Sequence, residues 1–219
     1  MKSMKINNLY NGIRLQLREL INPILAPSRV KRANIITSFS IISNNCWAGH
    51  VYRYFGLSYL TPTIGLYFFA PDYLKFVKDL KRYIDMDLTF IDWRQSKYKE
   101  EIIKRHQESI PIGLLGDVEI MFLHYKTAEE AKEKWTRRKK RINWNNLYFK
   151  MSEMNLCTPG LLKEFDALPC SNKLIFVTRD YGLNSQVIFK DYVGMKEVAN
   201  DTSNFIKYID ISTWLRKNN

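Results

Sequence analysis

Cysteine is scarce in this chain of 219 residues. The three cysteines are Cys46, Cys157 and Cys170, and no two of them have the CxxC spacing. An odd number of cysteines argues against a disulfide framework, and the missing CxxC spacing argues against a structural zinc site. The cysteine content therefore predicts a protein of a reducing compartment.

Long apolar runs are also missing. No uninterrupted apolar segment approaches the roughly 18 residues that a membrane-spanning helix needs. Arg14, Arg18 and Glu19 break the first apolar stretch, so it makes a poor secretory signal. The sequence therefore predicts a cytoplasmic protein.

Several common motifs are absent as well. The chain has no GxGxxG, P-loop, GxSxG or HExxH sequence, so Rossmann, P-loop NTPase and α/β-hydrolase chemistry lack their usual signatures. Asp85-Met86-Asp87 has the DxD spelling of many glycosyltransferases. It precedes a predicted strand, however, whereas that motif usually follows one. The residues by themselves indicate no particular cofactor or metal.

Acidic residues are outnumbered. Asp and Glu total 22 against 34 Lys and Arg, which gives a formal net charge of +12. Such a basic excess favours an anionic partner, for example nucleic acid, an anionic membrane surface or a phosphorylated metabolite. No known nucleic-acid-binding pattern occurs, so we do not expect nucleic acid. Aromatic residues make up 14% of the chain, and their rings can stack on sugars.

Residues 1–33 form a basic segment in which Glu19 is the single acid. Apolar residues recur there every four positions, which predicts an amphipathic helix that Pro23 and Pro27 end. The stripe consists of Leu9, Ile13, Leu17 and Ile21. Such a helix packs on its own domain or lies on an anionic membrane surface, and the first outcome is the commoner one.

Strand-like and helix-like segments alternate from residue 34 onward. Predicted strands cover residues 35–42, 63–69, 88–91, 147–151, 174–178 and 206–211. Residues 110–115 are a strand or a loop, and a second short apolar run follows at 120–124. Predicted helices cover residues 46–55, 71–83, 97–107 and 158–165, and a further helix starts at the capping box Thr127–Glu130. This alternation predicts a single α/β domain over residues 34–219, with a mostly parallel or mixed sheet and helices on both faces.

The first candidate site is the turn from strand 35–42 into the next helix. Ser43, Asn44 and Asn45 are N-cap residue types, and a helix start at the carboxyl end of a strand suits a phosphate or carboxylate. Cys46 falls in the first helical turn, where a thiol pKa tends to fall, and His50 shares its helix face. The pair fits a nucleophile and base, although a lone cysteine is more often a small buried hydrophobe.

The second candidate is the segment Gly113–Glu119, with His124 beyond it. If residues 117–119 are extended, Asp117 and Glu119 point to the same side and can form a metal site or an acid/base pair. An ordinary loop that enters a strand fits the same residues.

The third candidate is the run of five basic residues Arg137–Arg141. Cations at a helix C-terminus complement the helix dipole. Arg141 shares a face with Arg137 and is within reach of Arg138, and such a fork can grip a diphosphate or a lipid phosphate. Asn143 and Trp144 follow, and Trp144 can stack on a sugar or a base.

These candidates lie in segments that resemble a bacterial family, domain of unknown function family 1919, often labelled exopolysaccharide biosynthesis proteins. The segments are SNNCWAGHVYRYFG, TPTIGLYFFAPDYLKFVKDL, IPIGLLGDVEIMFLHYKTAEEAKEKWTRRKKRINWNNLYFKM, and FDALP with KLIFV. They cover roughly residues 33–180. The matching positions are Ser43, Asn44, Cys46, Gly49, Pro62, Gly65, Gly113, Asp117, Glu119, His124, Tyr125, Trp135, Arg138, Arg141 and Asn143. Ala48 and Met121 depart from the glycine and histidine that the family pattern leads us to expect.

The resemblance implies a three-layer α/β/α sandwich and a role in capsule, exopolysaccharide or lipopolysaccharide biosynthesis, but it assigns no catalytic residue. We expect a glycosyl- or acyltransferase that uses an activated sugar or acyl donor and a polyprenyl-diphosphate-linked glycan. The catalytic candidates are Cys46, His50, Asp117, Glu119 and His124. The ligand-binding candidates are Ser43, Asn44, Asn45, Arg137, Arg138, Arg141, Asn143 and Trp144.

One alternative remains open, a non-catalytic module that binds the polysaccharide machinery or its phosphorylated intermediates. If residues 1–33 lie on an anionic membrane surface instead of packing on the domain, they hold either protein at the inner face of the membrane.

Overall fold

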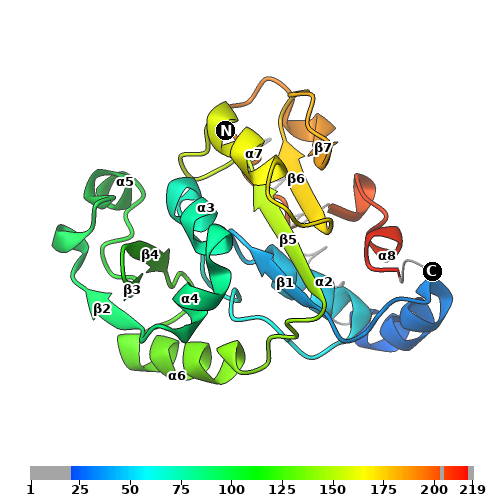
Figure 1. Cartoon of the computed structure of the whole chain (residues 1–219), viewed down its shortest axis with the longest axis horizontal. Helices are drawn as coiled ribbons and strands as arrows, with labels where there is room; N and C mark the ends of the chain where they lie inside the picture. Colours follow the sequence, from blue (N-terminus) through cyan, green and yellow to red (C-terminus); the bar gives the residue numbers. More distant parts are fainter. Residues whose placement is uncertain (1–20, 203–204, 217–219) are drawn as a thin grey trace, which may run out of the picture.

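A four-stranded parallel sheet forms the centre of the molecule. The structure is a computed structural model and describes residues 21–202 and 205–216. The strands of the sheet lie in the order β1 (Ser40–Ser43), β5 (Leu147–Ser152), β6 (Lys173–Val177) and β7 (Gln186–Ile188) (Figure 1). All neighbouring pairs are parallel, so the carboxyl ends of the four strands share one edge.

Helices cover both faces of this sheet, because successive strand residues point to opposite sides. Ile41 packs with α2 (Trp47–Phe55) and α8 (Ile211–Trp214) on one face. Ile42 packs with α3 (Ala70–Lys78) and α7 (Pro159–Asp166) on the other. The predicted α/β fold with helices on both faces is therefore confirmed.

A second, antiparallel sheet lies beside the first (Figure 1). It consists of β2 (Thr89–Ile91), β3 (Ile112–Leu115) and β4 (Val118–Met121), in that order. Gly116 has φ +59° in the two-residue turn from β3 to β4, a conformation that glycine adopts without strain.

Three further helices belong to the described residues, in addition to a helix over residues 21–33. They are α4 (Leu80–Asp85), α5 (Lys99–Lys104) and α6 (Ala128–Lys139), with single 3-10 turns at Trp93–Gln95, Lys190–Tyr192 and Phe205–Lys207. Thr127 caps α6 as predicted, because its side chain accepts a hydrogen bond from the Glu130 N–H at 3.2 Å.

Two predicted strands are wrong. Residues 63–69 form only an isolated bridge from Tyr67 to Met121, because the segment crosses between the sheets. The Tyr67 N–H donates to Met121 in the small sheet and the Phe68 N–H donates to Asn44 beyond β1. Residues 206–211 contain a 3-10 turn and the start of α8, where the Asp210 carboxylate accepts from two helical N–H groups.

Further features differ from the prediction. Strand β1 begins at Ser40, whereas the predicted strand begins at residue 35. The predicted helix over residues 71–83 is divided into α3 and α4 at Asp79. Strand β7 was not predicted. Residues 21–33 are helical, so Pro23 and Pro27 do not end that helix as expected. It is held against the domain by Arg29, whose Nη1 donates to the Tyr54 carbonyl at 2.9 Å.

Most of the predicted N-terminal stripe lies outside the described residues. Ile21, its last member, is 45% exposed.

Candidate functional site

The turn after β1 uses most of its polar groups to hold its own structure. Asn44 is fully buried, and its amide exchanges hydrogen bonds with the backbone of Ser152 at 3.1 and 3.2 Å, which fixes the end of β1 against β5. Ser43 Oγ donates to the Asn45 carbonyl at 2.6 Å. Asn45 Oδ1 accepts from the Trp47 N–H at 3.2 Å, although the residue at the N-cap itself is Cys46. Of the three predicted anion ligands, only Asn45 lines a pocket among those described below.

A buried ion pair lies directly beneath this turn. Lys150 and Asp201 are 0% and 1% exposed, and the Lys150 ammonium donates to the Asp201 carboxylate. Asn45 Nδ2 donates to both carboxylate oxygens at 2.9 and 3.0 Å, and Ser152 Oγ donates at 2.6 Å. Burial lowers the pKa of Lys150, whereas the Asp201 charge opposes this shift. These contacts therefore hold Asp201 at the carboxyl edge of the sheet.

Two pockets open at this edge. The first, the polar pocket, has a volume of about 390 Å³ and is rich in amide, hydroxyl and charged side chains. Its polar lining includes Asn45, Arg105, Gln107, Asn155, Glu197, Asn200, Asp201 and Thr202. Such groups are suited to the hydroxyls of a sugar.

The second pocket, the basic pocket, has a volume of about 330 Å³. Arg53, Lys134 and Arg138 line it, with Glu130 as the single carboxylate. Arg138 is held in place because its Nη1 donates to the Ile64 carbonyl at 3.1 Å and to the Tyr125 hydroxyl. The excess of cations suits a phosphate group.

Cys46, His50 and His124 line both pockets. The His124 N–H donates to the Gly65 carbonyl at 2.9 Å, and Cys46 Sγ donates to the Leu66 carbonyl at 3.4 Å. Gly65 has φ +75°, and a Cβ atom there would lie 2.9 Å from the Tyr125 ring. Hydrogen bonds to the Gly65 and Leu66 carbonyls therefore hold His124 close to Cys46 at the start of α2, although His124 is 74 residues later in the chain than His50.

The Cys46 thiol is not activated. Burial raises its pKa to about 11, against an ordinary value of 9.0. Desolvation outweighs the favourable position at the helix start, so the thiol stays protonated at neutral pH. The expectation of a lowered pKa is wrong for this residue.

The structure does not bring Asp117 and Glu119 into either pocket. Asp117 lies in the turn between β3 and β4, so the extended geometry that would pair the two carboxylates is absent. Lys75 Nζ and Tyr83 Oη donate to Asp117 at 2.9 and 2.7 Å. Glu119 is 4% exposed and accepts hydrogen bonds from Ser96 Oγ and the Lys97 N–H. Asp117 therefore fixes the β3–β4 turn to α3 and α4, and Glu119 fixes β4 to residues 96–97.

The basic run at the end of α6 is also divided. Arg138 lines the basic pocket, but Arg137 and Arg141 are exposed and do not line it. The pocket instead pairs Arg138 with Lys134, one helical turn earlier.

Asn143 and Trp144 lie at the opposite edge of the sheet. The Asn143 N–H donates to Ser40 Oγ at 2.8 Å, at the amino end of β1. Trp144 lies under the ammonium of Lys81, which is 5.1 Å from the ring centroid. Lys81 also pairs at 3.4 Å with Asp85 of the DxD sequence, which lines neither pocket. The three predicted segments therefore share one site only through residues 45–50, His124 and Arg138.

Sequence reasoning missed Lys150 and Asp201. One signal for Lys150 was present, since a single lysine interrupts the apolar strand Leu147–Ser152. Asp201 follows no pattern in the sequence. Within residues 21–202 and 205–216, no group of three His, Cys, Asp or Glu side chains is placed to hold a metal ion. In the same part of the chain, no helix is both long and apolar enough to span a membrane.

The chain is similar in sequence to a known protein and to a known family. A relative from Haemophilus influenzae, described as an uncharacterized protein, is 30% identical over 142 residues. The aligned region covers 65% of this chain and 63% of the relative, so the chain matches less than two thirds of that protein. The family model "Domain of unknown function (DUF1919)" matches residues 24–216. The chain therefore belongs to domain of unknown function family 1919.

Proposed function

We propose that the protein is a transferase of bacterial surface-polysaccharide biosynthesis that acts in the cytoplasm on a phosphorylated sugar. The observation that carries this proposal is that Cys46, His50 and His124 line both the polar and the basic pocket. A sugar phosphate fits these pockets with its phosphate beside Arg138 and Lys134 and its sugar beside the amides. Both volumes lie in the range of about 300–1,000 Å³ that is usual for small-molecule sites.

The proposed chemistry, where the polar and basic pockets meet at His50 and His124, is proton transfer. A sugar hydroxyl there forms the new bond to the activated carbon of a glycosyl or acyl donor. Its proton moves to an imidazole of His124 or His50, and the leaving group of the donor departs with the electron pair of the broken bond. Because Cys46 is protonated, we assign it no nucleophilic role. The proposed site accepts a sugar phosphate that is carried by a lipid or by a nucleotide.

A non-catalytic binding module is the second candidate. It is favoured by the protonated Cys46 thiol and by the structural roles of Asp117 and Glu119. This candidate keeps the sugar-phosphate site but makes no use of the histidines as bases.

Deletion of the gene followed by structural analysis of the surface glycan tests the proposal. We expect a missing sugar or substituent, restored by the wild-type gene and by Lys132→Gln, whose side chain is exposed on α6. His124→Gln and Lys134→Gln should not restore it. An unchanged glycan in the deletion strain would refute the proposal, and full restoration by folded His124→Gln and His50→Gln proteins would favour the binding module.

A further inference from the structure

A third pocket adjoins the basic pocket and differs from it in character. It has a volume of about 790 Å³ and lies between the helix over residues 21–33 and the end of α2. Its walls are mainly apolar, and they include Pro23, Ala26, Val30, Phe55 and Leu57. We call it the apolar pocket.

The packing of the helix over residues 21–33 creates this pocket. Gly56 ends α2 with φ +62°, and a Cβ atom at Gly56 would lie 2.8 Å from the Cβ of Ala26. Glycine therefore allows the two segments to approach closely. The Arg29 guanidinium lies 4.2 Å from the centre of the Tyr54 ring, and this contact fixes the helix over residues 21–33 beside α2. The helix and α2 thus form the walls of one cavity.

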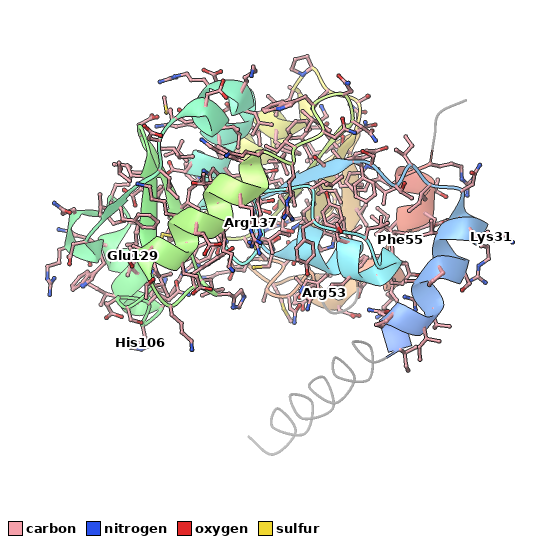
Figure 2. All side chains as sticks on the ribbon, turned by 90° about the horizontal axis from the view of Figure 1, so that it is seen from below. Lys31, Arg53, Phe55, His106, Glu129 and Arg137 are labelled. Carbon is pink, nitrogen blue, oxygen red and sulfur yellow. The ribbon has the colours of Figure 1, made fainter. Side chains whose placement is uncertain are left out.

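The apolar pocket shares His50, Arg53 and Tyr59 with the basic pocket. Figure 2 shows Arg53 on α2, between α6 on one side and the helix over residues 21–33 on the other. An apolar cavity therefore leads to a cluster of cations, and this cluster adjoins a polar cavity. A ligand that occupies all three must be apolar at one end, anionic in the middle and polar at the other end.

We infer that the apolar pocket holds the hydrocarbon chain of a lipid phosphate, whose phosphate lies in the basic pocket. The inference rests on the proposed function and chooses a lipid over a nucleotide as the carrier of the sugar phosphate. A nucleotide would place a polar ribose and base against Pro23, Val30 and Leu57, whose side chains offer no hydrogen bonds. A hydrocarbon chain has no such requirement.

A series of alkyl phosphates tests this assignment with the full chain. Calorimetric titration compares methyl, butyl, hexyl and octyl phosphate, each below the concentration at which it aggregates. Burial of one CH₂ group strengthens binding by up to about fourfold. We therefore expect affinity to rise steadily with chain length. Equal affinity for methyl and octyl phosphate would overturn the inference. The same result is expected if residues 1–20 or a second copy of the chain, and not a lipid, occupies the pocket.

A matched pair of variants on one helix locates the alkyl chain. Val30→Gln places an amide in the apolar pocket, and it should flatten the dependence on chain length while methyl phosphate binds as before. Ile24→Gln makes the same type of change at a side chain that is 77% exposed and does not line the pocket, so the dependence should persist. An identical dependence in both variants would refute this location.

The same titrations separate this inference from the proposed function. Lys134→Gln should weaken binding of methyl phosphate and of every longer member by the same factor. If methyl phosphate binds the wild type in a Lys134-dependent way but chain length has no effect, the lipid assignment fails and the sugar-phosphate site stands. If none of the phosphates binds, both proposals fail.

Discussion

An aspartate paired with a lysine lies beside each of the two sheets, in very different surroundings. Lys150 and Asp201 are 0% and 1% exposed at the carboxyl edge of the parallel sheet. Lys75 and Asp117 lie 2.9 Å apart beside the small sheet, with side chains 50% and 57% exposed. Only the buried pair adjoins the polar pocket. Asp117 of the exposed pair belongs to the second candidate segment, Gly113–Glu119.

The comparison shows what burial does to a charge. Removal of an ion from water costs several kcal/mol, about the free energy that decides whether a fold is stable. A buried pair is therefore kept only where further groups satisfy it, as Asn45 and Ser152 do here. An exposed pair is weak because water screens it. Three predictions, from the largest effect to the smallest, test this difference.

Lys150→Met should destabilise the protein by about 3–5 kcal/mol, because Asp201 then lacks a cation in a dry environment. Lys75→Met, the matched change at the exposed pair, should cost about 1 kcal/mol or less. Urea denaturation measures both free energies of unfolding. Addition of Asp201→Asn to Lys150→Met should restore part of the lost stability. Equal losses for the two lysine variants would remove the basis of the comparison.

At pH 8, Cys46 should react with iodoacetamide about a hundredfold more slowly than a thiol of pKa 9.0. Its own pKa is about 11, and at a fixed pH the thiolate fraction falls about tenfold for each unit by which the pKa is raised. Its rate should still rise above pH 9. Because the folded-state pKa is the higher one, Cys46 favours the folded state below pH 9, and this contribution is lost as the pH rises from 9 to 11. Peptide mapping by mass spectrometry follows the reaction. A rate equal to that of a free thiol would show that the carboxyl edge is not desolvated.

Asp117→Asn should have the smallest effect. Hydrogen bonds from Lys75 and then Tyr83 lower the pKa of Asp117 to about 2, from 3.8. The carboxylate therefore contributes stability above pH 3.8, and this contribution is lost as the pH falls towards 2. Because the group is exposed, we expect a cost of about 1 kcal/mol or less at pH 7, and less at pH 2.5. Urea denaturation at the two pH values checks this, and methyl phosphate should bind unchanged. Weakened phosphate binding would return Asp117 to the site.

Much of the fold was predictable because local signals agreed with tertiary packing. The apolar strands at residues 147–152 and 173–177 lie where the β-rich runs predicted them, and the strand at 40–43 matches the second half of the predicted strand 35–42. The caps Thr127 and Thr158 start their helices as expected. The segment at residues 63–69 misled because its β-type composition serves a crossing between two sheets. Its N–H groups bond to different partners, and no periodicity of one segment encodes that.

The sequence by itself determined the α/β class, the helix start at Asn45–Cys46 and the basic character of α6. These are properties of contiguous residues, whose spacing fixes their faces and caps. Only the tertiary structure decided that His124 and Arg138 lie at this helix start while Asp117, Glu119 and Trp144 lie elsewhere. It also brought Asp201 to Lys150. These positions depend on how distant strands and loops pack and on which charged groups are removed from water. Patterns among neighbouring residues encode neither.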